Sequence, residues 1–329
     1  MKKTFALFVV CMLVVGLLAG CGGGDKKPEA GKPAVQSVKM ILATGGTAGT
    51  YYPFGGAIAQ IWNSKIPGMN VTAQATGASV ENVKLVNKKD AELAIVQSDT
   101  VDFAFKGIES FKTGKQDKMM GIAVLYPEVI QVVVRADSGI NSIADLKGKK
   151  VGVGAPGSGT EANFRQLLDV YGLDYNALKP QYLSFSESAE QFKDKNIDAF
   201  IVVAGTPNSA IMDIGAQHAL KILPVPADMA TKLFAKYPFL APVKIPANTY
   251  KGITADVETV AVMAVLIVNP EVKEDVVYNL TKALFDNQEN LGKAHNKGKE
   301  LKLETATKGL SIPFHPGAVK YYKEKGIMK

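Results

Sequence analysis

The sequence predicts an α/β protein of two lobes, in which helices cover mostly parallel sheets. Short apolar runs alternate with helix-periodic segments over residues 38–98, and repeated βα units of this kind form parallel sheets. The same alternation restarts at residue 150 and continues to residue 225. Long apolar runs at 121–136 and 260–268 flank this second block. We therefore expect two crossover strands that form a hinge, with a cleft between the lobes.

The first block contains three expected strands and two expected helices. Ile58, Ile61 and Trp62 recur at helical spacing and predict one apolar helix face. Ser79 follows a Thr-Gly-Ala turn and is a suitable N-cap for the second helix. The strands are expected at 38–43, 71–75 and 93–96.

The remaining elements follow from the same signals. The segment Tyr126-Pro127-Glu128 predicts a break between two strands inside the run 121–136. Asn269 and Pro270 predict the start of a helix that reaches about residue 291, because Pro fits the first helical position. His315 is expected to begin a last short helix. Further strands are expected at 150–154, 181–185, 199–204 and 220–225, with helices around 164–171 and 187–195.

The N-terminus has the features of a secretory signal. A basic start precedes an apolar stretch from Phe5 to Leu18, which is too short for a transmembrane helix. The sequence Leu18-Ala19-Gly20-Cys21 resembles the lipobox of bacterial lipoproteins, in which the Cys is lipidated. We expect a signal peptide over 1–20, lipidation of Cys21 and a flexible tether over 21–36. An ordinary signal peptide that happens to contain a Cys is the alternative.

Composition argues against several classes of protein. Cys11 and Cys21 belong to the signal region, so the folded part has no disulfide and no thiolate ligand. The three His are scattered, and we expect no metal and no cofactor. The net charge of +7 is spread along the chain and only two Arg are present, Arg135 and Arg165, which argues against nucleic-acid binding. This basic charge suits a protein held next to an anionic membrane surface.

Five turns rich in Gly, Ser and Thr follow the carboxyl ends of expected strands. Ligands bind at this edge of open parallel sheets, where helix N-termini present backbone N–H groups that favour anions such as carboxylates. Each turn alone is equally well explained as an ordinary helix start, but two blocks that present such turns favour a binding cleft. The turns are 44–52, 76–79, 97–99, 155–160 and 204–207.

Two enzyme-like motifs fail in detail. The segment GAPGSGTE at 154–161 nearly matches a P-loop, but Thr160 stands where the phosphate-binding Lys belongs. Ser79 and Ser158 lack the paired glycines of a nucleophile elbow. We therefore expect a binding protein and not an enzyme, with an extracytoplasmic enzyme on the same fold as the less favoured alternative.

Five segments resemble the TAXI family of solute receptors, which serve tripartite ATP-independent periplasmic (TRAP) transporters. The resemblance covers the chain from about Val38, and its most specific parts are the motifs VQSD and GSGTE in this order. The segments are GGTAGTYYPFGGAIAQIWN (45–63), TGASVENVKLV (76–86), AELAIVQSDTV (91–101), VVVRADSGINSIADLKGKKVGVGAPGSGTE (132–161) and DAFIVVAGTP (198–207).

This resemblance implies a type II periplasmic-binding-protein fold that closes about its hinge on a small carboxylate, such as glutamate or glutamine. It implies delivery to a TRAP permease in the membrane. No binding arginine is expected, since Arg135 and Arg165 fall at structural or surface positions. The ligand contacts that it implies are Tyr52, Ser79, Gln97, Ser98, Gly157, Ser158, Gly159, Thr160 and Thr206, to which the first turn adds Thr47 as a candidate.

The expected lobe boundaries follow the two crossovers. Lobe I comprises residues 37–130 and 257–329, and lobe II comprises 131–256, with a return boundary between 225 and 260. We expect an exported, membrane-anchored monomer that faces the periplasm or the cell exterior. A binding protein of an ATP-driven importer, or a ligand-sensing partner of a sensor kinase, is the alternative function.

Overall fold

The computed structural model describes residues 37–329, which form one unit. The predicted signal peptide, Cys21 and the tether lie outside the described residues. Among the described helices, none has both the length and the apolar character needed to cross a membrane.

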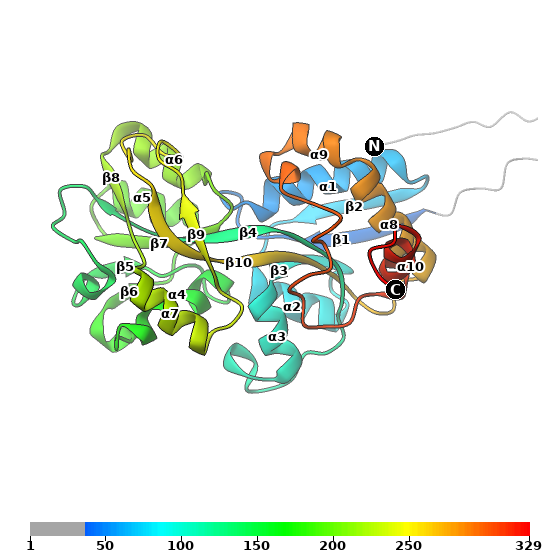
Figure 1. The fold of residues 1–329 in the computed structure, drawn as a ribbon, viewed down its shortest axis with the longest axis horizontal. Coiled ribbons are helices and arrows are strands. Elements are labelled where there is room, and N and C mark those ends of the chain that lie inside the picture. Colours follow the sequence, from blue (N-terminus) through cyan, green and yellow to red (C-terminus); the bar gives the residue numbers. More distant parts are fainter. Residues whose placement is uncertain (1–36) are drawn as a thin grey trace, which may run out of the picture. The chain divides into compact units, whose positions relative to one another are not determined.

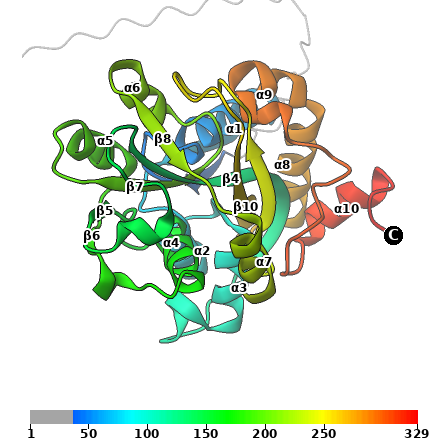
Figure 2. The ribbon, with the colours of Figure 1, turned by 60° about the vertical axis from the view of Figure 1, so that its left-hand side comes forward.

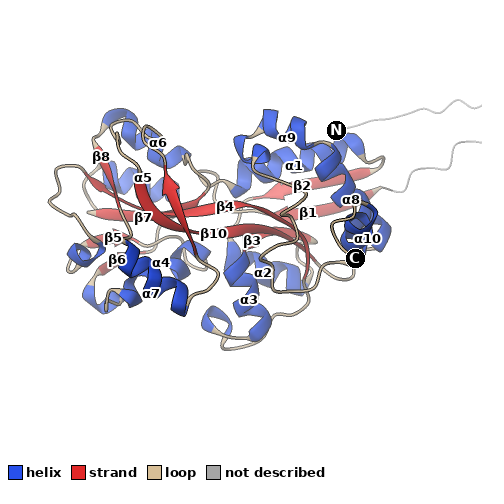
Figure 3. Ribbon diagram, viewed as in Figure 1, coloured by secondary structure: helices blue, strands red, loops and turns tan. Residues whose placement is uncertain are grey.

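Two long strands form the middle of a ten-stranded sheet. β4 (Met120–Arg135) and β10 (Val257–Val268) pair in antiparallel fashion, and Figures 1 and 3 show both strands running between two groups of helices. Beyond β10 the sheet continues with β3 (Leu93–Gln97), β1 (Val38–Ala43) and β2 (Met69–Gln74). Beyond β4 it continues with β7 (Ala199–Ala204), β5 (Lys150–Gly152) and β6 (Lys179–Gln181). In addition, β8 (Leu220–Leu223) pairs with β4, and β9 (Ala241–Ile245) pairs with β10.

Helices cover both faces of the sheet on each side of this central pair. We call β1–β3 and their helices the first half, and β5–β9 and their helices the second half. The helices of the first half are α1 (Tyr51–Lys65), α2 (Ser79–Lys88), α3 (Ser98–Lys106), α8 (Glu274–Asp286), α9 (Gln288–Ala294) and α10 (Pro316–Glu324). Those of the second half are α4 (Gly159–Val170), α5 (Phe185–Lys193), α6 (Ser209–Gln217) and α7 (Ala227–Lys236). Short 3-10 turns lie at Glu109–Phe111, Ile143–Leu146, Tyr175–Ala177 and Asn296–Lys299.

Each half has its own hydrophobic core on each face of the sheet. Trp62 and Phe54 of α1 belong to one cluster with α8 and α10, while α2 and α3 contribute to a cluster on the opposite face. In the second half, Phe164 of α4 and Phe200 of β7 belong to different clusters. Figure 2 shows α1 and α6 on the opposite side of the strands from α2, α3 and α4. This arrangement confirms the predicted α/β fold with two lobes.

Parallel pairing brings the polar turns together at the middle of the molecule. β1 runs parallel to β2 and β3, and β5 runs parallel to β6 and β7. The carboxyl ends of parallel strands meet at one edge of a sheet, so the turns after β1, β2, β5 and β6 face the opposite half of the molecule.

The structure differs from the prediction at the crossover strand β4. The expected break at Tyr126-Pro127-Glu128 is wrong, because β4 is continuous from Met120 to Arg135. Pro127 pairs with Met263 of β10, and pairing with β7 starts only at Val129. Proline has no N–H to donate to a neighbouring strand. This is tolerated at Pro127 because β7 pairs with β4 only from Val129 onward. The proposed lobe boundary at residue 130 falls inside this strand.

Two predicted helix starts are also wrong. Asn269 accepts a hydrogen bond from the Glu271 amide at 3.0 Å, which forms a turn, and α8 begins only at Glu274. Ser79 is the first residue of α2 and not its cap, and its hydroxyl accepts a hydrogen bond from the Gln97 amide at 3.1 Å.

The helix α7 and the strand β9 were not predicted, because Pro residues and short apolar runs give no clear period between 226 and 245.

Candidate functional site

Four helices begin around one partly enclosed cavity of about 80 Å³, called the enclosed cavity below. α1 and α2 reach it from the first half, and α4 and α5 reach it from the second half. Each helix start leaves backbone N–H groups without partners inside the helix. Some of these groups have partners outside the helix, since the Val80 and Glu81 amides of α2 donate to the Gly157 oxygen and the Glu161 amide of α4 donates to Ser158 Oγ. Its lining residues are Gly45, Gly46, Ala48, Gly49, Thr50, Tyr51, Thr76, Gly77, Ala78, Ser79, Gln97, Glu128, Ala155, Ser158, Gly159, Thr160, Ser184, Phe185, Ser186, Val203 and Ala204.

Glycines let the two halves approach each other at the cavity. A Cβ atom built on Gly159 would lie 1.7 Å from Gln97 Oε1 and 3.1 Å from Ser79 Oγ, both in the other half. A Cβ atom on Gly77 would lie 3.2 Å from the backbone oxygen of Pro156. Side chains at these positions would hold the halves apart, so the glycines allow the close packing that encloses the cavity.

A buried carboxyl group lines this cavity. Glu128 lies on β4, has an exposed fraction of only 2%, and accepts a hydrogen bond from the Tyr51 hydroxyl at 2.5 Å. Burial removes the water that would solvate the charge and raises the pKa of Glu128 to about 8, although the Tyr51 bond acts in the opposite direction. The pKa of Tyr51 is raised well above its usual value, by burial and by the Glu128 charge.

Gln97 lies at the end of β3 and contacts both halves. Its exposed fraction is 2%, and its Oε1 atom is buried without a hydrogen-bond partner in residues 37–329. A buried carbonyl oxygen without a partner costs about 1–3 kcal/mol. The side chain is close enough to Glu128 to lower the pKa of that carboxyl. Gln97 therefore presents an unused acceptor in the wall of the cavity.

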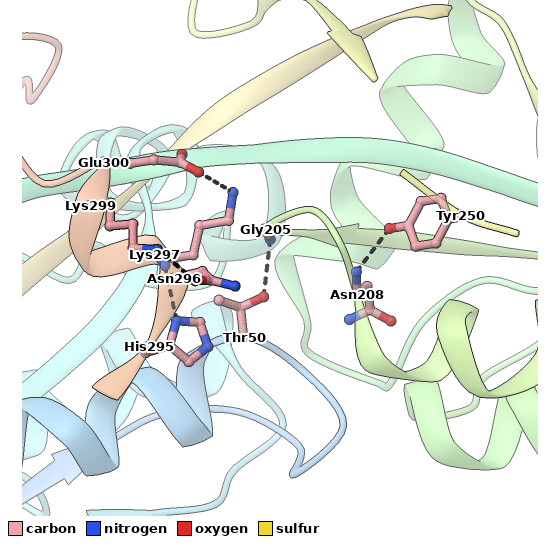
Figure 4. A network of polar contacts seen from close by, with 9 residues as sticks. All are labelled: Thr50, Gly205, Asn208, Tyr250, His295, Asn296, Lys297, Lys299 and Glu300. Carbon is pink, nitrogen blue, oxygen red and sulfur yellow. Dashed lines mark hydrogen bonds and ion pairs between the residues drawn. The ribbon is translucent and has the colours of Figure 1, made fainter. Parts of the chain in front are cut away.

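Hydrogen bonds join the two halves around the cavity. The backbone oxygen of Gly157 accepts a bond from the Val80 amide, at the start of α2, at 3.2 Å. Thr50 Oγ1 accepts from the Gly205 amide at 3.1 Å, a bond that Figure 4 shows between the two halves. Asn208 donates through Nδ2 to the backbone oxygen of Ala48 at 3.1 Å.

A further buried contact between the halves joins α3 and α4. Asn163 Nδ2 donates to Asp99 Oδ2 at 2.7 Å, and both side chains are buried. Burial raises the pKa of Asp99, while the bond from Asn163 acts to lower it. The contact adds to the bonds that hold the halves together.

A larger cavity of about 450 Å³ lies on the other side of the segment Ala48–Thr50. Its wall includes His295 and Lys297, next to the short turn after α9. Lys297 is buried, and its Nζ forms an ion pair with Glu300 Oε1 at 2.6 Å (Figure 4). The positive charge of this lysine is therefore already partnered.

The structure brings five of the ten predicted contact residues to the enclosed cavity. These residues are Ser79, Gln97, Ser158, Gly159 and Thr160. Gly157 lies beside them and contacts α2 through its backbone oxygen without lining the cavity.

The other predicted contacts lie elsewhere. Tyr52 points to the surface with 37% of its area exposed, and Thr47 is exposed as well. Thr206 lines the larger cavity, and Ser98 is buried beside Phe239 in a separate shallow pocket.

The two arginines have structural partners. Arg135 donates to the backbone oxygens of Phe192 and Ile197 at 2.9 and 2.8 Å. Arg165 forms an ion pair with Glu161 at 3.1 Å. Neither arginine lines the enclosed cavity.

Sequence reasoning missed Tyr51 and Glu128. Tyr51 shares the buried face of α1 with Phe54 and Ile58, so the helical period favours it over Tyr52. Glu128 is the only charged residue between Gly121 and Val134. A single acid in an otherwise uncharged crossover strand was a usable signal, because buried acids are retained where they have a function or a partner.

Comparison with known proteins identifies a family and a similar extracellular protein. A model of the NMT1-like family matches residues 42–326. The arginine-binding extracellular protein ArtP of Bacillus subtilis is 28% identical over 218 residues, which cover 61% of this chain and 73% of ArtP.

Two solved structures share the fold. PhnD1 of Prochlorococcus marinus, solved with methylphosphonate, is 10% identical, with a TM-score of 0.54 over 88% of this chain and 99% of PhnD1. GshT of Streptococcus mutans, described with glutathione import and a cystine ABC importer, is 15% identical, with a TM-score of 0.50 over 81% of this chain and 95% of its own.

These results correct one prediction and confirm another. The assignment to the TAXI family of TRAP receptors is wrong, because the matching model is that of the NMT1-like family, and the similar proteins include one named as arginine-binding and one described together with a cystine ABC importer. The type II periplasmic-binding-protein fold is confirmed by the solved structures. The chain belongs to the NMT1-like family.

Proposed function

We propose that this protein is the extracytoplasmic binding component of an ABC importer, and that it captures a small carboxylate-bearing solute between its two halves. The observation that carries the proposal is the enclosed cavity at the N-termini of α1, α2, α4 and α5. Two helices come from each half, so a ligand in this cavity contacts both halves at once.

The cavity suits an anionic group that is held without a basic side chain. Its lining contains no Lys, Arg or His. Helix starts favour anions through their N–H groups and the helix dipole. Ser79 Oγ accepts a bond from the Gln97 amide, and its hydroxyl lies close enough to Tyr51 to act to lower the pKa of that phenol. Thr160, at the start of α4, adds a second hydroxyl.

Closure of the two halves supplies the selectivity of binding. The bonds from Val80 to Gly157 and from Gly205 to Thr50 form only when the halves are together. A ligand that bridges both halves makes more contacts in the closed arrangement than in an open one, so its binding stabilises the closed arrangement. β4 and β10 are the segments about which the halves turn, and residues 37–130 with 257–329 and residues 131–256 are the proposed lobes.

The proposed importer and location rest on the family and on similar proteins. ArtP is an arginine-binding extracellular protein, and GshT is described together with an ABC importer. A lipid on Cys21 and the segment 21–36 would tether the monomer beside its permease.

Calorimetry of the purified protein with amino acids and small carboxylates tests the proposed ligand class. Thr160→Val is expected to weaken binding about tenfold, in line with the loss of one hydrogen bond to a charged group. Thr160→Ser keeps the hydroxyl and is expected to bind like the wild type. Equal affinities in all three proteins would exclude Thr160 as a contact, and absence of binding to every solute would reject the ligand class.

Uptake into proteoliposomes tests the proposed importer. A candidate ABC permease would be reconstituted with the binding protein and a labelled solute. We expect uptake that requires ATP and the binding protein. Uptake driven by an ion gradient without ATP would contradict the proposal.

A further inference from the structure

We infer that Glu128 binds the ligand as a neutral carboxylic acid and donates a hydrogen bond to the ligand carboxylate, so that capture of the solute requires one proton on the protein. The inference rests on the proposed function, since it concerns the same cavity. Glu128 lies in the middle of β4, the long strand that runs between the halves, and it lines the enclosed cavity.

The charge of the cavity is the first argument. The lining contains no Lys, Arg or His, and Glu128 is its one acidic residue. No ion pair within residues 37–329 includes Glu128. An ionised Glu128 would place a second negative charge beside the ligand carboxylate, without a cation in the wall to balance the two. Two carboxyl groups that share such a site retain one proton between them.

The hydrogen bond of Glu128 to Tyr51 is the second argument. The Tyr51 hydroxyl donates to Glu128 Oε2 at 2.5 Å, so this oxygen serves as the acceptor of the carboxyl group and Oε1 can carry the proton. Glu128 is only 2% exposed, so its O–H cannot turn to bulk water. A ligand carboxylate in the cavity offers this O–H a charge-assisted bond, which is about twice as strong as a bond between neutral groups.

The protonation of the cavity without ligand supports this arrangement. Burial raises the pKa of Glu128 to about 8, so the carboxyl group is mostly neutral at pH 7 before a ligand binds. The Asp99 charge acts in the same direction, whereas the Tyr51 bond and the Lys297 charge act in the opposite one. The pKa values of Tyr51 and Tyr126 are raised well above the usual value for a phenol, so neither group titrates near pH 8. A bound carboxylate raises the pKa of Glu128 further, because its charge is of the same sign.

Ligand affinity is therefore expected to fall at alkaline pH. Ionisation of Glu128 above about pH 8 removes the donor and leaves a negative charge in its place. Affinity should be nearly constant between pH 6 and 7, and should fall by up to about tenfold for each pH unit above 8. Ligand binding at pH 9 should take up close to one proton, because the complex holds a proton that the empty cavity has lost.

The experiment compares the wild type with Glu128→Gln over a range of pH. Glutamine keeps an oxygen for the Tyr51 hydroxyl and offers an N–H in place of the O–H, so it mimics the neutral acid at every pH. The probes are acetate, pyruvate, lactate, glutamate and glutamine, and the tightest of them is titrated by calorimetry from pH 6 to 9.5. Any titration of the probe itself affects both proteins equally, so the ratio of the two affinities isolates Glu128.

We expect the variant to bind about as tightly as the wild type at pH 7 and about tenfold more tightly at pH 9. Proton uptake, measured as the dependence of the calorimetric enthalpy on the ionisation enthalpy of the buffer, should occur at pH 9 in the wild type and be absent in the variant. This measurement on the wild type alone decides the inference should the variant fail to fold.

Two further variants sharpen the comparison. Glu128→Met has no polar hydrogen to donate and is expected to weaken binding about tenfold at pH 7. Glu92→Gln is the matched control, because this carboxyl group accepts a bond from the Ile41 amide outside the cavity. It should retain the pH profile of the wild type.

The outcomes separate this inference from the proposed function. An affinity ratio that stays constant from pH 7 to 9, or wild-type binding without proton uptake at pH 9, would overturn the inference and leave a carboxylate-binding protein. Tighter binding by the wild type than by Glu128→Gln at pH 9 would also overturn it, since the ionised carboxylate would then be the binding form. Failure of all five probes to bind at any pH would reject the proposed ligand class together with the inference.

Discussion

Gly159 at the start of α4 faces the side-chain amide of Gln97 so closely that an added Cβ atom would lie 1.7 Å from Gln97 Oε1. The two residues belong to different halves of the molecule. Their contact shows that the halves are packed together around the cavity, and that the absence of a side chain at residue 159 allows this packing.

Gly159→Ala is therefore expected to hinder closure. Overpacking of this kind costs about 1–3 kcal/mol, so ligand affinity measured by calorimetry should fall about 5- to 150-fold. Gly56→Ala is the control, because a Cβ atom there meets nothing within 4 Å. This helical substitution should leave affinity unchanged and stabilise the fold slightly. Equal affinities in the two variants would contradict the role of Gly159.

Thr50→Val is expected to destabilise the closed arrangement through a lost acceptor. Thr50 Oγ1 accepts from the buried Gly205 amide at 3.1 Å, and valine keeps the shape but not the oxygen. A buried N–H without a partner costs about 1–3 kcal/mol, so affinity should fall by a similar free energy. Thr50→Ser keeps the oxygen and should restore most of the affinity. If the serine variant lost as much affinity as the valine variant, the result would argue against this bond.

Stability without ligand is expected to fall as the pH rises from about 5 to 8. The pKa of Glu128 is about 8 in the folded protein against 4.5 for an ordinary Glu, so the folded protein retains a proton that the unfolded chain has lost in this window. The loss is at most on the order of 5 kcal/mol in the free energy of unfolding. The titratable groups that act on Glu128 are Tyr51, Asp99, Tyr126 and Lys297.

Denaturant unfolding at several pH values checks this dependence. In Glu128→Gln most of the slope between pH 5 and 8 should vanish. Any slope that Asp99 contributes should have the same sign, because burial also raises the pKa of Asp99. Parallel curves for the wild type and Glu128→Gln would show that Glu128 does not hold the proton.

Much of the candidate site was predictable because its residues lie in turns that local sequence patterns reveal. Ser158 and Thr160 lie in a Gly-rich turn that starts a helix, and the parallel-sheet pattern places such turns at one edge. The predicted contact Tyr52 lies at the surface and its neighbour Tyr51 lines the cavity, because the two differ in which face of α1 they occupy. Thr206 was assigned to the same cavity as Thr160 but lines the other one, on the far side of Ala48–Thr50.

The sequence by itself determined the alternation of strands and helices, the two crossover runs and the position of the polar turns. These features depend on the period of apolar residues and on turn chemistry, which act over a few neighbouring positions. Only the tertiary structure decided that Glu128 and Gln97 share one cavity with the starts of four helices. Their proximity depends on the pairing of strands far apart in the chain, and their charge state depends on burial, which no local pattern encodes.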